Sequence, residues 1–387
     1  MRMMILGGDG YLGWPTAMYF AARGHEVMAV DNYLRRQIAM ETDSMPLFNT
    51  PLLDERAAIF RDMSNHHVEV EIGDISDMRF MDRIFSSFKP ECVVHYGEQP
   101  SAPYSMRGFN EARMTLSNNI LGTYNVIAAV LEHAPEAHIV KLGTMGEYGT
   151  PNIDIEEGYI EIEHNGRSDR FLFPRAAGSL YHTTKVNTTD ILNFHCRVFG
   201  LRVTDLMQGP VYGLVTEEAA GHPELLPNFH YDDIFGTVIN RFLVQAVAGV
   251  PLTVYGKGGQ TRGYLDLRDT LQCVELAAKN PSAAGEHRIY NQFVEQFTVN
   301  ELAEKVREAG EEIGIDVKVE PIPNPRKEME DHYYNAKHSA LLELGLKPHY
   351  LTKEVVKDLL AKVAENKDNI VKRRIMPRVV WNKPKPA

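Results

Sequence analysis

The chain has 387 residues, with 41 lysines and arginines against 52 aspartates and glutamates, so its formal net charge is −11. A protein this acidic lacks the basic face that general nucleic-acid binding requires. The hydrophobic share of 44% is enough for a large buried core, and the ordinary glycine and proline contents exclude fibrous and low-complexity classes. The length corresponds to two or three domains, or to one large nucleotide-binding fold with an added lobe.

The cysteines and the apolar segments indicate the compartment. The three cysteines, Cys92, Cys196 and Cys273, form no CxxC pair, which argues against a disulfide framework or a structural zinc site and favours a reducing compartment. Apolar runs stay well short of the about 18–20 residues that a membrane span needs. The chain opens on a core strand rather than a charged leader. We therefore expect no targeting peptide, no membrane contact and a cytoplasmic location.

Short apolar strands alternate with helical segments through the first half of the chain. Strands are predicted at 3–6, 26–30, 68–72, 92–95, 138–142 and 202–206, and helices at 12–23, 78–88, 119–132 and 180–199. This alternation predicts an α/β fold of the doubly wound Rossmann type, with a parallel sheet and helices on both faces. After residue 212 the pattern is less regular, with a strand at 252–255 and a helix at 299–313, which indicates a smaller C-terminal substrate-binding lobe.

The domain organisation follows from these patterns. We assign residues 1–212 to an NAD-binding Rossmann domain with insertions near 32–54 and 158–173, and residues 213–371 mainly to the lobe, leaving open a return of the chain to the Rossmann domain. Asn165-Gly166 between alternating residues predicts a hairpin, either a lid beside the active-site strand ends or a surface feature. Residues 372–387, which include Lys383 and Lys385, form a basic tail. A solvated or subunit-bound arm is favoured there over an arm that binds an anionic partner.

A glycine-rich segment follows the first strand and opens the first helix. Gly7, Gly10 and Gly13 permit a tight turn and a close approach of backbone N–H groups to a pyrophosphate at the helix N-terminus. The glycines alone are weak evidence, but their place at the start of a βαβ unit is the place that dinucleotide binding requires.

Asp31 ends the second strand, where a carboxylate accepts hydrogen bonds from a ribose diol and repels a 2′-phosphate. The pattern therefore favours NAD over NADP as the cofactor. Arg35 and Arg36 keep the alternative open, because arginine near this place can accept a phosphate, although both could pair with the pyrophosphate or with acids in the insertion. The remaining candidates for cofactor binding are Tyr11, Leu12, Asn32, Asp74, Ile75, Tyr96, Gly97 and Asn119.

Tyr181 and Lys185 lie four residues apart on a predicted helix and therefore share one face. The ammonium group is expected to lower the pKa of the phenol, which would make Tyr181 a base near neutral pH. Thr144 ends the fifth strand and offers a hydroxyl where such a tyrosine would act. The three residues predict a hydride-transfer triad: Thr144 orients an alcohol, Tyr181 removes its proton, and Lys185 also binds the nicotinamide ribose. A surface Tyr–Lys pair is the less favoured alternative.

Together these motifs resemble the extended short-chain dehydrogenase/reductase family of nucleotide-sugar epimerases and dehydratases, over roughly residues 1–280. Residues 255–266 are similar to that family's segment for the substrate diphosphate, with Arg262 as the forked cation. In the family's 4,6-dehydratases an Asp-Glu pair directly follows the catalytic hydroxyl, whereas Met145 and Gly146 stand here and the acid comes at Glu147. The resemblance implies substrate contacts for Gln99, Met106, Thr144, Gln208, Tyr255, Gln260 and Arg262.

A closer resemblance, over nearly the whole chain, is to the group of UDP-sulfoquinovose synthases within that family. It rests on residues 97–99, 101–106, 141–159, 164–167 and 335–338, while Pro100 stands where the plant-type enzymes carry arginine. The resemblance implies bound NAD, a homodimer, and UDP-glucose with sulfite, or a sulfur-donor protein, as partners.

The implied reaction begins with oxidation at C4 of the glucose, after which Glu147 or His182 removes the C5 proton and water leaves across C5–C6. Sulfite then adds at C6, and C4 is reduced again. A UDP-sugar 4-epimerase or 4,6-dehydratase is the alternative within the family, and a catalytically silent NAD sensor is the alternative outside it. Chemistry of this kind needs no metal, and the histidines show no metal-ligand spacing.

Overall fold

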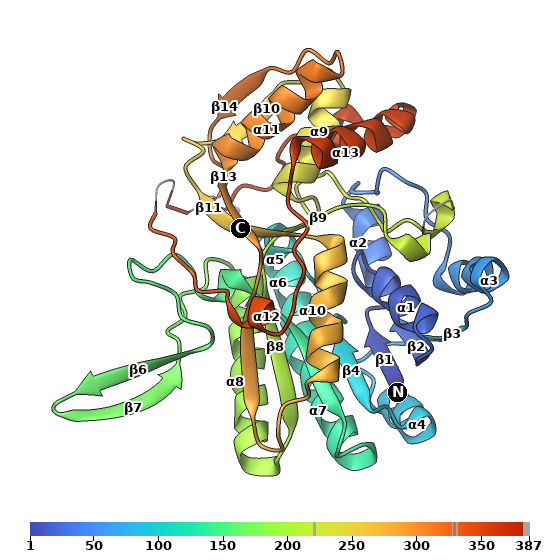
Figure 1. The fold of residues 1–387 in the computed structure, drawn as a ribbon, viewed down its shortest axis with the longest axis vertical. Coiled ribbons are helices and arrows are strands. Elements are labelled where there is room, and N and C mark those ends of the chain that lie inside the picture. Colours follow the sequence, from blue (N-terminus) through green and yellow to red (C-terminus); the bar gives the residue numbers. More distant parts are fainter. Residues whose placement is uncertain (220–221, 327, 330–331, 382–387) are drawn as a thin grey trace.

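A computed structural model describes residues 1–219, 222–326, 328–329 and 332–381 of the chain. Its centre is a seven-stranded parallel sheet in the order β12-β8-β5-β4-β1-β2-β3 (Figure 1). The doubly wound Rossmann-type α/β fold predicted from the sequence is confirmed. The strands of this sheet are β1 (Arg2–Leu6), β2 (Glu26–Asp31), β3 (Val68–Ile72), β4 (Cys92–His95), β5 (His138–Thr144), β8 (Arg202–Gln208) and β12 (His287–Gln292).

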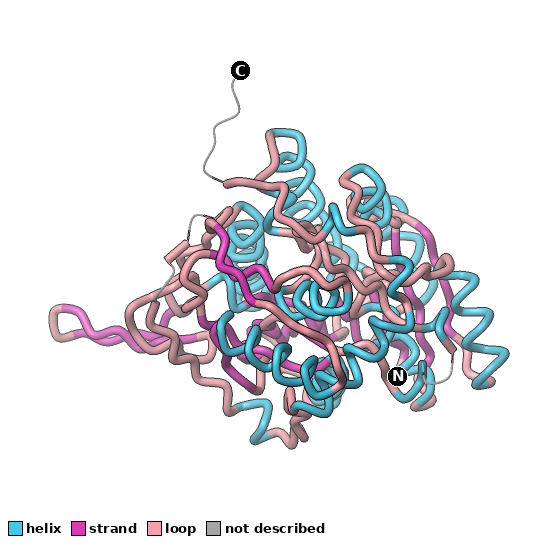
Figure 2. Tube along the Cα trace, turned by 90° about the horizontal axis from the view of Figure 1, so that it is seen from above, coloured by secondary structure: helices cyan, strands magenta, loops and turns pink. Residues whose placement is uncertain are grey.

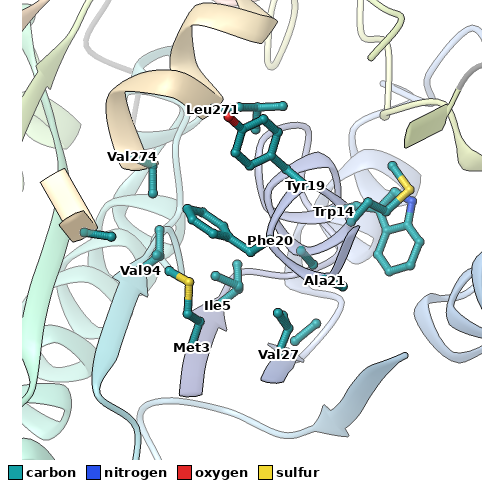
Figure 3. Packing of buried hydrophobic residues seen from close by; sticks show 14 of the residues in the cluster. Met3, Ile5, Trp14, Tyr19, Phe20, Ala21, Val27, Val94, Leu271 and Val274 are labelled. Atoms are coloured by element: carbon teal, nitrogen blue, oxygen red, sulfur yellow. The ribbon is translucent and has the colours of Figure 1, made fainter. Parts of the chain in front are cut away.

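Helices cover both faces of the sheet, because successive side chains of a strand point to opposite faces. Met3 and Ile5 of β1 belong to the apolar cluster on one face, and Met4 and Leu6 belong to the cluster on the other. Figure 3 shows the first cluster, in which side chains of α1 lie between those of β1 and α10. The covering helices are α1 (Gly13–Ala22), α3 (Leu53–Ser64) and α10 (Leu267–Lys279) on the first face, and α4 (Met78–Phe88), α7 (Gly122–His133) and α8 (Leu180–Phe199) on the second.

A second apolar core lies beyond the carboxyl ends of the central strands (Figure 1). Phe242, Leu302 and Leu360 bring its three helices together. The chain leaves this lobe to form β12, so a strand from residues 287–292 joins the central sheet. The lobe consists of α9 (Val238–Val247), α11 (Val299–Glu312), α13 (Lys353–Glu365), the parallel pair β10 (Leu252–Tyr255) and β14 (Val319–Ile322), and the sheet of β9 (Val211–Tyr212), β11 (Thr261–Asp266) and β13 (Glu295–Thr298).

The inserted hairpin consists of β6 (Tyr159–His164) and β7 (Arg167–Leu172). Asn165 and Gly166 turn it with φ values of 51° and 71°, as a type I′ turn requires. The Tyr159 hydroxyl donates to the carbonyl oxygen of His287 at 2.9 Å, at the start of β12 and thus at the edge opposite the carboxyl ends. The hairpin projects away from the body of the molecule (Figures 1 and 2). The structure therefore favours the surface feature over the lid.

The basic tail pairs with acids of its own chain in the part that the structure describes. Arg373 and Arg374 each contact Asp43 at 2.7 Å, and Arg378 contacts Asp233 at 2.9 Å. The expectation of a solvated or subunit-bound arm is corrected for residues 372–381, because acids from the first insertion and from the lobe neutralise these arginines. Residues 382–387, with Lys383 and Lys385, lie outside the described residues.

The described residues include no helix that is long and apolar enough to cross a bilayer. Cys92, Cys196 and Cys273 are all buried and unpaired.

Candidate active site

The glycine-rich loop lies between β1 and α1, against the backbone that follows β4. A Cβ atom at Gly13 would lie 1.9 Å from the carbonyl oxygen of Gly7, and one at Gly7 would lie 2.8 Å from the carbonyl group of Tyr96. Gly7 also has a φ of +87°, in the region that favours glycine. Side chains cannot be accommodated at Gly7 and Gly13, so the backbone N–H groups of the loop are not covered by side chains from these positions.

A cavity opens where β1, β2 and β4 end. It is lined by most of the residues predicted to bind the cofactor, namely Gly7, Gly10, Tyr11, Leu12, Gly13, Asp31, Asn32, Arg35, Ile75, Tyr96 and Gly97, and also by Gln99 and Pro100. The buried Nε of Arg35 has no hydrogen-bond partner among the residues that the structure describes. A glycine backbone and an unpartnered guanidinium nitrogen suit a pyrophosphate, so the cavity fits a dinucleotide.

Asp31 is held in place at the edge of this cavity by two backbone N–H groups. The N–H of Asp9 donates to its Oδ2 at 2.9 Å, and the N–H of Tyr33 donates to its Oδ1 at 2.7 Å. Burial, followed by the charge of Asp9, raises the pKa of Asp31 to about 6. Each carboxylate oxygen retains a lone pair that can accept a hydrogen bond from a ribose hydroxyl.

Arg36 does not line the cavity, unlike Arg35. Its Nε and a terminal nitrogen donate to the carboxylate of Asp9 at 2.6 and 2.8 Å, and it also bonds the carbonyl oxygens of Thr50 and Pro51. The acid that pairs with Arg36 therefore belongs to the glycine-rich loop rather than to the insertion, and the arginine stabilises that loop.

Asp74 and Asn119 lie behind the cavity wall and position residues that line it. The amide nitrogen of Asn32 donates to Oδ2 of Asp74 at 3.0 Å. The buried Asn119 accepts the N–H of Gln99 at 2.7 Å and donates to Thr184 Oγ1 at 2.9 Å, which ties the segment after β4 to α8.

The structure brings Thr144, Tyr181 and Lys185 to the same end of the sheet. Thr144 is the last residue of β5, and the other two lie in the first two turns of α8. Lys185 is 2% exposed and forms an ion pair with Glu98, and its Nζ donates to the carbonyl oxygen of Leu142 at 2.5 Å. The Nζ lies 5.9 Å from the centroid of the Tyr181 ring. Tyr181 and Lys185 are therefore close together, and the lysine pairs with a carboxylate, Glu98, that the sequence analysis did not assign.

The pKa of Tyr181 is raised above the ordinary value of a phenol, opposite to the expected direction. Burial is the largest cause, followed by the negative charges of Glu98 and Glu147. The charge of Lys141 acts in the opposite direction but does not offset these effects. The expectation of a phenol with a lowered pKa is therefore corrected for the protein without its ligands.

Glu147 is completely buried behind Thr144. Its carboxylate accepts the N–H of Thr144 at 3.3 Å and the hydroxyl of Thr189 at 3.1 Å. Lys141 and Arg175 lie 3.5 and 3.6 Å from it. Burial raises the pKa of Glu147, which increases its affinity for a proton. Glu147 thus supports the strand end that carries the Thr144 hydroxyl.

His182 lies against Tyr181, with ring centroids 5.0 Å apart. Its Nδ1 is 2.9 Å from Oγ of Ser179, the N-cap residue of α8. Burial and then the charge of Arg262 lower the pKa of His182 to about 3. The imidazole is therefore neutral at physiological pH.

The carboxyl ends of β5, β8 and β12 lie in register. Thr144 pairs with Gln208, and Gln208 pairs with Gln292. The side chain of Gln208 donates to Thr270 Oγ1 at 3.4 Å and to Gln292 Oε1 at 3.3 Å. Gln208 is therefore placed beside Thr144 at the end of β5. Met106 caps the short helix α5 (Ala102–Ser105) and is partly exposed.

The predicted diphosphate segment forms the turn from β10 into β11. Arg262 contacts Glu328 at 3.2 Å and His332 Nε2 at 3.0 Å. The side chain of Gln260 donates to the carbonyl oxygen of Tyr255 at 3.2 Å, and its Oε1 is buried without a partner in the described part of the chain. These residues lie together in the lobe, as the sequence predicts, although an acid already accompanies the arginine.

Arg326 is a further cation that the sequence analysis missed. Its charge, like that of Arg262, lowers the pKa of His182. It directly follows a proline-rich segment, residues 321–325, where no motif marks it. Glu98, by contrast, stood within the run 97–99, and a buried acid that pairs with Lys185 could have been anticipated there.

Comparisons with known proteins agree with this geometry. Residues 3–291 match the NAD dependent epimerase/dehydratase family. The chain is 50% identical to the chloroplastic UDP-sulfoquinovose synthase of Spinacia oleracea, over 99% of this chain and 79% of that protein. It is 45% identical to the UDP-sulfoquinovose synthase of Sulfolobus acidocaldarius, over 99% of this chain and 98% of that protein.

Solved structures share the fold. The UDP-glucose 4-epimerase of Bifidobacterium longum, in complex with NAD⁺ and UDP, has a TM-score of 0.72 at 19% identity and covers 96% of this chain and 100% of its own. The UDP-glucose 4-epimerase of Thermus thermophilus, in complex with NAD, has a TM-score of 0.65 at 23% identity and covers 94% and 99%. The chain belongs to the NAD dependent epimerase/dehydratase family, in the group that contains the UDP-sulfoquinovose synthases.

Proposed function

We propose that this chain converts UDP-glucose and sulfite into UDP-sulfoquinovose and water. The observation that carries the proposal is the identity of 50% and 45% to two UDP-sulfoquinovose synthases over 99% of the chain, the lobe included. Within the site, the absence of an Asp-Glu pair directly after Thr144 supports a synthase over a 4,6-dehydratase.

NAD would be held by the residues of the cavity. The backbone of the glycine-rich loop and Arg35 would bind the pyrophosphate, Asp31 the adenosine ribose, and Lys185 the nicotinamide ribose. When bound, NAD⁺ supplies the acceptor for the hydride from C4 of the sugar and, as NADH, returns it.

The residues of the chain would guide the protons. Thr144 orients the C4 hydroxyl, and Tyr181 takes its proton as the C4 ketone forms. The ketone acidifies the C5 hydrogen, which Glu147 or His182 removes as the C6 hydroxyl leaves as water. The sulfur lone pair of sulfite then forms a bond to C6 and C5 regains a proton, after which Tyr181 returns its proton to the C4 oxygen. Hydrogen sulfite and UDP-glucose thus yield UDP-sulfoquinovose and one water.

The lobe would bind the nucleotide diphosphate. Arg262 would exchange Glu328 for a phosphate, and Arg326 would contribute a second cation. Tyr255 and Gln260 form the turn beside them. Gln99, Met106 and Gln208 remain the proposed contacts around the sugar.

We also propose a homodimer. Leu121 and Tyr124 are 47% and 49% exposed and line an apolar groove with Leu116 and Ile191. The groove runs over α6 (Phe109–Leu116), the following turn of π-helix (Ser117–Leu121), α7 and α8. A second copy would cover these apolar side chains.

Mass spectrometry tests the function. The purified protein is incubated with UDP-glucose, NAD⁺ and ³⁴S-labelled sulfite, and a UDP-sugar that carries the label is expected. Unlabelled UDP-galactose, which has the mass of the substrate and is separated from it by chromatography, would instead identify the epimerase, and a UDP-4-keto-6-deoxy sugar would identify the dehydratase. Tyr181→Phe is the control, because it removes the phenol oxygen that takes and returns the proton of the C4 hydroxyl.

A further inference from the structure

We propose that Ser179 is a positioning residue that fixes the tautomer of His182, so that the imidazole presents an Nε2–H donor to the active site. The role of that donor rests on the proposed function, whereas the tautomer itself does not.

The geometry places one hydroxyl against two atoms of His182. Ser179 is 6% exposed and is the N-cap residue of α8. Its Oγ accepts the backbone N–H of His182 at 3.2 Å and lies 2.9 Å from Nδ1 of the same residue. The side chain therefore serves both the start of the helix and the imidazole ring.

The number of available hydrogens decides which atom donates in the hydrogen bond between Ser179 Oγ and His182 Nδ1. A serine hydroxyl has one hydrogen to donate, and buried donors need acceptors. Among the described residues, Nδ1 of His182 is the only acceptor that the Ser179 hydroxyl reaches. If Nδ1 carried a proton instead, the hydroxyl hydrogen would be buried without a partner, at a cost of about 1–3 kcal/mol. The hydroxyl therefore donates to Nδ1, and the proton of the neutral ring resides on Nε2.

Nε2 points at the loop that follows the catalytic threonine. A Cβ atom at Gly146 would lie 2.4 Å from Nε2 of His182. The imidazole thus occupies the space in which any side chain at residue 146 would stand. Residue 146 is one of the two positions at which the dehydratases carry an acid. In this chain the neutral imidazole of His182 on α8 occupies that space instead.

A neutral imidazole with hydrogen on Nε2 donates a hydrogen bond but takes no proton at that atom. His182 then cannot remove the C5 proton through Nε2, and Glu147 is the remaining candidate. The donor suits a negatively charged oxygen at C6, either on the departing hydroxyl or on the arriving sulfite. Preorganised donors of this kind stabilise developing charge.

Three substitutions at Ser179 separate the tautomer from the helix cap. Ser179→Thr retains both the cap and the hydroxyl. Ser179→Asp retains the cap, because aspartate is an equally good N-cap residue, but it only accepts hydrogen bonds and therefore draws a proton to Nδ1. Ser179→Ala loses both. Thr352→Asp is the matched control: Thr352 caps α13 through the N–H of Val355, in the lobe.

Nitrogen-15 NMR of histidine-labelled protein reports the tautomer without substrate or sulfite, and His182→Gln identifies the signals of His182. We expect protonated Nε2 and unprotonated Nδ1 in the wild type and in Ser179→Thr, and protonated Nδ1 in Ser179→Asp. Protonated Nδ1 in the wild type would overturn the proposal.

Kinetics report the role of the donor. We expect kcat for sulfosugar formation to fall about a hundredfold in Ser179→Asp, as for a lost preorganised donor, and to stay near wild type in Ser179→Thr and Thr352→Asp. Exchange of the C5 hydrogen without sulfite falls in parallel if the donor serves the departing hydroxyl, whereas only the sulfite-dependent step falls if it serves sulfite. Unchanged kcat in Ser179→Asp with protonated Nδ1 would contradict the role. A wild type with the expected tautomer but no sulfosugar would refute the proposed function alone.

Discussion

Buried charges around Tyr181 change the pKa of its phenol. Glu98 pairs with Lys185, and the charge of Glu98 raises the pKa of the phenol. The sequence places a lysine and a tyrosine on one helical face, and the structure confirms that placement. The sequence does not reveal the direction of the pKa shift of Tyr181, because the burial of the phenol and the nearby Glu98 depend on other elements of the fold.

We expect Glu98→Gln to move the pH dependence of UDP-glucose oxidation toward lower pH. Glu98 raises the pKa of Tyr181, so its removal lowers that pKa, and the phenolate forms at lower pH. The rate of NADH formation from UDP-glucose and NAD⁺, measured against pH, reports the shift. Glu161→Gln, on the exposed hairpin, serves as the control. An unchanged profile, or one moved to higher pH, would refute this account of the tyrosine.

Gly146→Ala is expected to lower kcat about a hundredfold, the cost of displacing a catalytic group by roughly an ångström. The added methyl group would lie 2.4 Å from Nε2 of His182, so the imidazole must move. Gly178→Ala is the matched control, because a Cβ atom there meets nothing within 4 Å. Thermal unfolding should be similar for both variants. Wild-type kcat in Gly146→Ala would show that this contact is unimportant.

At the scale of elements, the tail and the first insertion support each other. Arg378 binds Asp233, which lies 145 residues earlier in the chain, and the carbonyl oxygens of Thr42 and Asp43, which lie 336 and 335 residues earlier. No local pattern reveals such a partner, which is why the tail could not be placed from the sequence. The hairpin, in contrast, was predictable from Asn165-Gly166 because a two-residue turn depends on its own residues. The orientation of the hairpin could not be predicted, because it depends on packing against the rest of the molecule.

Arg378→Ala is expected to reduce the free energy of unfolding by about 1–3 kcal/mol, because it leaves the nearly buried carboxylate of Asp233 without its guanidinium partner. Urea unfolding measures the change. Arg61→Ala is the comparison, since its pair with Asp62 is 54% and 72% exposed and such pairs contribute about 0–1 kcal/mol. Equal losses for the two variants would contradict a structural role for the tail.

At the scale of the whole molecule, the alternation of strands and helices is sufficient to predict the parallel sheet. The return of the chain in β12 was left open, because its pairing with β8 is formed across the lobe and has no local signal. The cofactor cavity was predictable at its glycines and at Asp31, which follow from strand ends. Of the two cations in the lobe, Arg262 was predictable from its motif, whereas Arg326 was not, because it stands outside any motif.

The proposed dimer gives a test at this scale. Leu121→Asp places a charge in the apolar groove, and desolvating it would oppose association. Light scattering should report the mass of a dimer for the wild type and of a monomer for the variant. Met63→Asp, on α3 and 47% exposed, should remain dimeric. A monomeric wild type would refute the homodimer, and a dimeric Leu121→Asp would place the interface elsewhere.

The fate of two sugar hydrogens distinguishes the whole cycle most directly. The enzyme is supplied with UDP-glucose, NAD⁺ and sulfite in heavy water, and the product is examined by NMR. A hydride that is removed and returned within one site keeps ordinary hydrogen at C4, while the proton at C5 comes from solvent as deuterium. Sulfoquinovose with hydrogen at C4 and deuterium at C5 is the predicted product. Deuterium at C4, or ordinary hydrogen retained at C5, would contradict the mechanism.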